Sequence, residues 1–474
     1  MVFSSIIFLC YFLPVFLLAY FLCPARLKNY CIIAASLLFY AWAAPRFVFV
    51  ILGTTFFDFL VVRALDRSEN ERSRKGLLCL SLLVNVGLLF YFKYCNFFID
   101  QLNAVLALFH VSGIKWLSVV LPIGISFYTF ETITYVVDVY RRVHKPVQKF
   151  SDYLLYIILF PKLIAGPIIR FHEFADQVTT HHLNENAENR LRGLYRFFIG
   201  LAKKVLLANT IGAFADTIFA LPVQEVGTFT AWMGALAYTF EIYFDFSGYS
   251  DMAIGLALIM GFRFPENFNN PYTATSVTDF WRRWHITLGN WMKNYLYIPL
   301  GGNRVKSGRL YLNLFIVFLA SGLWHGAAWG FIFWGAYHGL FLVLERLFLS
   351  EALKRIGKLS VVYTFFVVTV GWVLFKLEHL RPALAYMRRM FGGYAEDQHL
   401  WYAGREFWVI FALAAFSSFF GLSNWGKQVQ ARFYDRSFST AGHFCMFLLM
   451  ASLFVLLAGH ITTSTFNPFI YFRF

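Results

Sequence analysis

Residues 281–325 read WRRWHITLGNWMKNYLYIPLGGNRVKSGRLYLNLFIVFLASGLWH. A basic, tryptophan-rich segment at the start of this stretch carries His285, and an apolar segment at its end carries His325. An ionisable side chain at membrane depth is costly to bury, and such residues usually mark functional sites. We therefore ask whether these two histidines carry out chemistry together or only complete a buried network.

The composition predicts a polytopic membrane protein. Of 474 residues, 59% are hydrophobic and 14% are charged, whereas soluble domains are about half apolar and about a quarter charged. A spanning helix needs about 20 apolar residues, and the chain contains many such runs. The runs are continuous rather than alternating, which excludes a membrane barrel. We expect an all-α fold of about 11–13 transmembrane and re-entrant helices, one domain over residues 1–474 and a catalytic core segment at 243–338.

The basic residues indicate membrane topology rather than nucleic-acid binding. The net charge is +15, but the lysines and arginines are scattered through loops between apolar runs. Positively charged cytoplasmic loops explain this pattern, and residues 63–75 form the strongest such loop in the N-terminal half. The cysteines include no CxxC pair and no Cys/His cluster, so we expect neither a metal site nor a disulfide framework.

Two apolar runs contain helix-breaking residues. Pro122 and Gly124 interrupt the run at 121–131, and Pro161 and Pro167 interrupt the run at 160–171. Breaks of this kind are tolerated where a helix lines a cavity inside the protein. We expect broken helices in both places.

The segment 276–295 has the pattern of an amphipathic helix. Ser276 followed by Asp279 resembles an N-terminal cap. Apolar residues then recur with helical spacing at Trp281, Trp284, Leu288 and Trp291. This pattern predicts an interfacial helix at the cytoplasmic headgroups. His285 lies beside the apolar face, and its role can be functional or structural.

His325 lies in the sequence LASGLWHGAAWG. Ser321 precedes it by one helical turn, and Trp324 is its neighbour. A neutral imidazole can act as a general base on an alcohol near neutral pH. The alternative is a core histidine that is hydrogen-bonded across helices. For His338, which also lies in an apolar run, we favour a structural or cavity-lining role.

Two carboxylates lie in the apolar run YFDFSGYSD at 243–251. At membrane depth, Asp245 and Asp251 must pair, bind a proton or face water. Candidate partners are Lys203, Lys204 and Arg263. The carboxylates suggest either buried hydrogen bonds or the coupling site of a transporter.

The sequence GGNR at 301–304 contains Asn303 and allows two interpretations. Successive backbone N–H groups there can form a phosphate-binding nest. A turn between the amphipathic segment and the next span is the simpler interpretation.

Together these stretches resemble the membrane-bound O-acyltransferase family, specifically its bacterial alginate O-acetyltransferase branch. The resemblance covers nearly the whole chain and is most specific in its middle third. The matching strings are MVFSS at the N-terminus, FYAW at 39–42, LPIGISFYTFE at 121–131, FPKLIAGPIIRF at 160–171, YFDFSGYSDMAIG at 243–255, NFNNPY and FWRRWHITL across 267–288, YIPLGGNR at 297–304, GLWHGAAW at 322–329 and NPFIYFRF at the C-terminus.

The resemblance implies a ring of membrane helices around a central tunnel, which joins a cytoplasmic donor to an acceptor on the far side. It implies that His325 is the essential catalytic residue, acting as the base, and that His285 is the second functional position. We expect the substrate-binding or tunnel residues to include Asp245, Ser321, Trp324, Asn303 and His338.

The resemblance also implies a multi-pass enzyme of the bacterial inner membrane, in contact with membrane lipid and not with nucleic acid. Acetyl-CoA or a related acyl thioester would be the donor, and no cofactor would be permanently bound. The acetyl group would pass to hydroxyls of a cell-surface polysaccharide with the help of a periplasmic, SGNH-hydrolase-like acetyltransferase. Alternatives are a peptidoglycan O-acetylation subunit, a D-alanyl transferase, a secondary transporter that uses Asp245, Asp251 and Glu131, and a structural export subunit.

Overall fold

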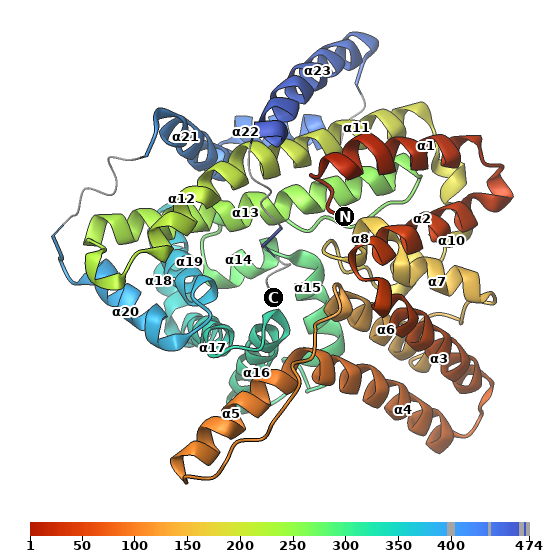
Figure 1. Ribbon diagram of the computed structural model, residues 1–474, viewed down its shortest axis with the longest axis horizontal. Coiled ribbons are helices and arrows are strands. Elements are labelled where there is room, and N and C mark those ends of the chain that lie inside the picture. Colours follow the sequence, from red (N-terminus) through yellow and green to blue (C-terminus); the bar gives the residue numbers. More distant parts are fainter. Residues whose placement is uncertain (396–402, 435–437, 464–468, 471–474) are drawn as a thin grey trace. The chain divides into compact units, whose positions relative to one another are not determined.

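The computed structural model describes residues 1–395, 403–434, 438–463 and 469–470, and these are mostly helical (Figure 1). Within these residues, the only β pairing is one antiparallel bridge between Phe268 and Trp284. Of the C-terminal string at 467–474, only Phe469 and Ile470 are described. The predicted all-α fold is confirmed.

Seven helical segments of the described residues are long and apolar enough to cross a membrane. These are Pro45–Arg67, Glu71–Leu108, Ala187–Ala220, Ser307–His325, Trp329–Lys376, Arg405–Leu422 and Thr440–Thr462. Ile7–Leu22 is a shorter apolar helix. The protein is thus a multi-pass membrane protein. The count of 11–13 segments, which included re-entrant pieces, and the ring around a tunnel stay predictions.

The chain divides into two compact units. The first comprises residues 1–189 and 260–264, and the second comprises residues 190–259 and 265–474. The single domain over residues 1–474 stays a prediction. The helices of the first unit are α1 (Leu13–Leu22), α2 (Lys28–Ala43), α3 (Val48–Arg67), α4 (Glu71–Leu89), α5 (Cys95–Leu108), α6 (Ile125–Tyr140), α7 (Phe150–Ile158), α8 (Phe160–Leu163), α9 (Phe171–Phe174) and α10 (Gln177–Thr180).

Both predicted helix breaks in the first unit are confirmed. Helix α6 begins only after Gly124, which has a φ of +80°. Gly124 also lies against the backbone of Leu163, because a Cβ at this position would lie 2.5 Å from the Leu163 carbonyl oxygen. Helices α7 and α8 are separated at Leu159, and irregular backbone follows α8. A buried ion pair between Lys162 and Glu131 joins α8 to α6. This pair offsets the cost of placing each charge in the interior.

The second unit contains the candidate site. Its helices are α11 (Ala187–Ala202), which starts just before the unit boundary, α12 (Asn209–Ala220), α13 (Thr228–Ile259), α14 (Val277–Arg283), α15 (Ile286–Trp291), α16 (Ser307–His325), α17 (Trp329–Leu344), α18 (Ser350–Ile356), α19 (Ser360–Lys376), α20 (Leu380–Phe391), α21 (Arg405–Phe419), α22 (Asn424–Tyr434) and α23 (Thr440–Thr463).

The long helix α13 is almost wholly buried and runs beside α11 and α12 (Figure 1). Glycines allow α11 and α13 to approach closely. A Cβ at Gly200 would lie 2.5 Å from the Gly248 carbonyl oxygen, and one at Gly193 would lie 2.6 Å from that of Gly255. Both pairs repeat after seven residues, so they lie on one face of each helix. This glycine seam brings Arg196 of α11, and the two lysines that directly follow α11, to the carboxylates of α13.

Helices α16 and α17 form a hairpin that holds His325 at its turn. A Cβ at Gly322 would lie 2.3 Å from the Phe331 carbonyl oxygen, and one at Gly335 would lie 2.3 Å from that of Phe318. The two backbones therefore touch without intervening side chains. Helix α19 packs against α17 on this hairpin.

The prediction of one helix over 276–295 is wrong. The Ser276 cap is confirmed, because its Oγ accepts a hydrogen bond from the Asp279 N–H at 3.0 Å. Helix α14 then ends at Arg283, and α15 starts at Ile286 after the left-handed residue His285.

Backbone hydrogen bonds between residues 267–269 and residues 283–286 stabilise this break. The N–H of Asn269 donates to the Arg283 carbonyl at 2.9 Å, and the N–H of Ile286 donates to the Asn267 carbonyl at 3.0 Å. Trp284 between them is buried against Phe268 and Trp372. The interfacial-anchor interpretation is therefore wrong for Trp284, which belongs to the core.

Candidate active site

His285 has an unusual backbone conformation, and its ring contacts a neighbouring side chain. Its φ of +46° is unusual for a residue with a side chain, and such backbone strain is typical of functional sites. Its Nδ1 lies 3.0 Å from the Oδ1 of Asn267. The side chain is only 2% exposed, and this burial lowers the pKa of His285 to about 3. The imidazole is therefore neutral at physiological pH.

The rings of His285 and His325 contact the same indole. The Trp324 ring lies 5.9 Å from the His285 ring and 5.0 Å from the His325 ring, measured between centroids. His325 also meets Trp334 and Phe375 edge to face, each at 5.1 Å. Residues forty positions apart thus contact one shared indole in a buried cluster, which answers part of the question that the sequence left open. The tunnel expected between them stays a prediction.

The other predicted residues lie at different distances from this cluster. His338 on α17 joins it, because its ring lies 5.2 Å from that of Trp334. Ser321 is buried one turn before His325 on α16. Asn303, in contrast, lies exposed in the turn before α16, where it accepts a hydrogen bond from the Tyr297 hydroxyl at 3.1 Å. Its predicted role in binding or in the tunnel stays a prediction.

Both carboxylates of α13 are paired with cations. Asp245 contacts the Nζ of Lys204 at 2.5 Å, and Asp251 contacts the Nζ of Lys203 at 2.6 Å. The two lysines begin a π-helical turn (Lys203–Ala208), a distortion often found at functional positions. Arg196 on α11 also donates to Asp251, at 3.0 and 3.1 Å. The predicted lysine partners are thus found, while Arg263 belongs to the other unit.

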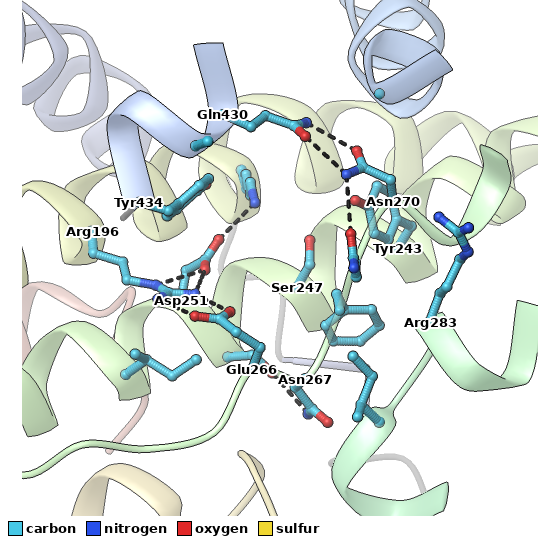
Figure 2. A pocket seen from close by; sticks show the side chains of 18 of the residues that line it. Arg196, Tyr243, Ser247, Asp251, Glu266, Asn267, Asn270, Arg283, Gln430 and Tyr434 are labelled. Carbon is cyan, nitrogen blue, oxygen red and sulfur yellow. Dashed lines mark hydrogen bonds and ion pairs between the residues drawn. The ribbon is translucent and has the colours of Figure 1, made fainter. Parts of the chain in front are cut away.

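A polar cavity of about 570 Å³ opens beside this charged group (Figure 2). Its lining includes Arg283 and Ile286, which lie on either side of the break at His285, and Asn267, but neither His285 nor His325. Helix α22 closes one side of the cavity. The positions of α22 that line the cavity are one helical face: Lys427, Gln430, Ala431 and Tyr434.

Helix α22 is hydrogen-bonded to the loop that precedes α14. The side-chain amides of Gln430 and Asn270 exchange two hydrogen bonds, at 2.8 and 2.9 Å (Figure 2). The Tyr434 ring lies 5.0 Å from the guanidinium of Arg196. The cavity is therefore bounded by α11, α13, the 265–270 loop and α22.

Sequence reasoning missed several of these residues. The face of α22 repeats at i, i+3, i+4 and i+7, a signal that helical periodicity could have found. Asn267 gave no such signal, because asparagines in NFNNPY are equally typical of turns. Arg196 becomes a partner of Asp251 only through the glycine seam.

Comparisons with known proteins identify relatives of this chain. The sequence model of the membrane-bound O-acyltransferase family matches residues 84–350. A probable alginate O-acetylase AlgI of Pseudomonas aeruginosa is 46% identical over 395 residues, which cover 82% of this chain and 75% of the relative. A peptidoglycan O-acetyltransferase of Helicobacter pylori is 38% identical over 427 residues, which cover 83% and 80%. A teichoic acid D-alanyltransferase of Bacillus subtilis is 29% identical over 273 residues, which cover 53% and 68%.

A multi-pass helical fold with histidines buried at its core, together with these relatives, defines a membrane enzyme that transfers acyl groups. The chain belongs to the membrane-bound O-acyltransferase family. The predicted family is thereby confirmed.

Proposed function

We propose that this enzyme transfers an acetyl group from a cytoplasmic thioester, acetyl-CoA, across the bacterial inner membrane to hydroxyls of a cell-surface polysaccharide of the alginate type. The observation that carries the proposal is the similarity to the alginate O-acetylases. A second probable alginate O-acetylase AlgI, from Azotobacter vinelandii, is 47% identical over 82% of this chain and 78% of the relative. That similarity spans both buried histidines.

The polar cavity supports an anionic donor. Its lining carries four cationic side chains and two carboxylates, namely Arg196, Lys203, Arg283, Lys427, Asp251 and Glu266. Lys427 makes no ion pair with any residue that the structure describes. Phosphate groups of coenzyme A would satisfy such a cation. The donor would then lie beside the break at His285.

The chemistry requires one base and one group that positions the donor. His325 would accept the proton of the receiving hydroxyl as its oxygen attacks the thioester carbonyl carbon. The carbon–sulfur bond then breaks, and the leaving thiolate takes a proton, so protons balance. General-base catalysis contributes about 10²- to 10⁴-fold. His285 would either orient the donor or stabilise the oxyanion of the thioester carbon.

The acetyl group must reach a polymer outside the cell. A periplasmic, SGNH-hydrolase-like acetyltransferase would complete this transfer, so the receiving hydroxyl belongs either to the polymer or to that partner. The names of the alginate O-acetylase relatives indicate alginate, a polysaccharide, as their acceptor.

The transporter alternative loses support from the ion pairs. Glu131 pairs with Lys162, Asp245 with Lys204, and Asp251 with Lys203 and Arg196. A coupling carboxylate must exchange its proton or ion during transport. Carboxylates that are each bound to a cation of the same chain fit a structural role better.

Peptidoglycan O-acetylation is the second candidate. The peptidoglycan O-acetyltransferase of Helicobacter pylori covers as much of this chain as the alginate relatives do, at lower identity. The D-alanyl transferase similarity covers about half of the chain. The acceptor, exopolysaccharide or peptidoglycan, therefore distinguishes the first two candidates. The donor, which carries acetyl or D-alanyl, distinguishes both of them from a D-alanyl transferase.

The proposal is tested by acetyl analysis of surface polymers in cells that carry wild-type protein, His325→Ala or the exposed control His379→Gln. We expect acetate on the exopolysaccharide with wild-type protein and the control, and none with His325→Ala at equal abundance in the membrane. Acetate that appears on peptidoglycan instead would favour the second candidate. Normal acetyl content with His325→Ala would exclude His325 as the base.

A further inference from the structure

The side chain of Asn267 is buried and contacts three residues. Its Oδ1 lies 3.0 Å from the Nδ1 of His285, 2.9 Å from the Oγ1 of Thr287 and 3.3 Å from the backbone nitrogen of Thr287. Its Nδ2 donates to the Oγ of Ser250 at 3.1 Å. Asn267 therefore lies between helix α13 and the residue at the break between α14 and α15.

These contacts fix which end of the amide faces the histidine. A backbone N–H can only donate, so the atom that faces Thr287 must be the amide oxygen. The reversed amide would place two donors against each other. The hydroxyl of Ser250 can accept from the other end in the observed orientation. The oxygen of Asn267 thus faces His285.

The orientation of the amide determines the tautomer of His285. An amide oxygen only accepts, so the Nδ1 of His285 must carry the proton. A neutral imidazole has a single N–H, which leaves a lone pair on Nε2. We propose that Asn267 is a positioning residue that holds His285 in the tautomer with the proton on Nδ1 and an acceptor lone pair on Nε2.

This inference rests on the proposed function for the identity of the substrate, and it decides between the two roles of His285. An oxyanion needs a hydrogen-bond donor, and Nε2 without a proton cannot provide one. An acceptor can instead hold an N–H or O–H group of the bound substrate. In this tautomer His285 can orient the substrate but cannot stabilise the oxyanion, so other groups must do so.

Backbone contacts allow this role to be tested without destroying the fold. The carbonyl of Asn267 accepts from the N–H of Ile286 at 3.0 Å, and this bond does not depend on the side chain. Asn267→Asp keeps an oxygen toward His285 and Thr287. Asn267→Leu removes it. Thr287→Val is the matched control, because it removes one contact with Asn267 and keeps the Thr287 N–H.

Acetyl transfer by purified protein in liposomes gives the first measurement. We expect kcat to fall at least about tenfold with Asn267→Leu, by analogy with the loss seen when the partner that orients a metal-bound histidine is removed. Asn267→Asp should stay within about threefold of wild type, and the carboxylate should raise the basicity of His285 and shift the pH profile. Thr287→Val should also stay within about threefold. Wild-type kcat with Asn267→Leu would overturn the proposal.

The tautomer itself can be measured by solid-state NMR on protein labelled with ¹³C and ¹⁵N at histidine. The signals of His285 are those lost in His285→Gln. We expect a protonated Nδ1 and an unprotonated Nε2 in wild-type protein, and loss of this state with Asn267→Leu. A protonated Nε2 in wild-type protein would refute the proposal. This measurement needs no turnover, so an inactive protein with a protonated Nδ1 would contradict the proposed function alone.

Discussion

Replacing Asp251 with asparagine should destabilise the wall of the cavity that is built from α11 and α13. The carboxylate accepts from Arg196 at 3.0 and 3.1 Å and from Lys203 at 2.6 Å. Removing one partner of a buried ion pair costs about 3–5 kcal/mol, because the remaining charge is left uncompensated. Arg196 keeps its bonds to Glu266, and the Lys203 side chain is 23% exposed. We therefore expect the lower end, about 3 kcal/mol.

A double-mutant cycle tests this reasoning. Lys203→Met should cost less than Asp251→Asn, about 1–2 kcal/mol, because Asp251 keeps both bonds from Arg196. The double variant should cost less than the sum of the single variants, since both remove the same interaction. The assay is denaturant unfolding in detergent micelles. Additive losses, or an Asp251→Asn protein as stable as wild type, would refute the assignment.

Two further outcomes follow from the packing and from the buried histidine. Gly322→Val should strongly reduce the amount of folded protein, because a Cβ there would lie 2.3 Å from the Phe331 carbonyl oxygen. Gly308→Ala, whose Cβ would meet no atom within 4 Å, should leave the amount of folded protein unchanged. Protease resistance in membranes measures the folded fraction of both variants. His285 has a pKa of about 3 in the folded protein and 6.5 when unperturbed, so the unfolded chain binds more protons between these values. Between pH 3 and 6.5 the free energy of unfolding should thus rise by up to about 1.4 kcal/mol per pH unit. Urea titrations at several pH values measure this rise, and His285→Gln should make it smaller. The same rise in wild-type protein and His285→Gln would contradict the burial of His285.

The features that depend on local sequence were predictable. The all-α fold follows from continuous apolar runs, and the helix breaks follow from Pro122, Gly124 and Pro161. That Asp251 pairs with a cation follows from the high cost of an unpaired charge in an apolar run; which of the candidate cations it binds does not. Each of these conclusions needs only the chemistry of a short segment.

The features that depend on distant segments were not predictable. The tryptophan spacing continues through Trp284 and Trp291 as if one helix were present, but pairing with residues 267–269 breaks that helix at His285. Periodicity carries no information about such a partner. The role of Asn267 depends on the same pairing. The meeting of His285 and His325 was expected only as a consequence of folding.

The most direct test of the account is acetyl transfer by the purified enzyme in liposomes, measured with labelled acetyl-CoA on one side and an acceptor hydroxyl on the other. The account predicts label on the acceptor with wild-type protein and the His379→Gln control. With His325→Ala it predicts a loss of at least about 10²-fold, the contribution expected of a general base, while folding and donor binding are kept. Transfer at the wild-type rate by His325→Ala would contradict the central claim that the buried histidine cluster carries out the reaction.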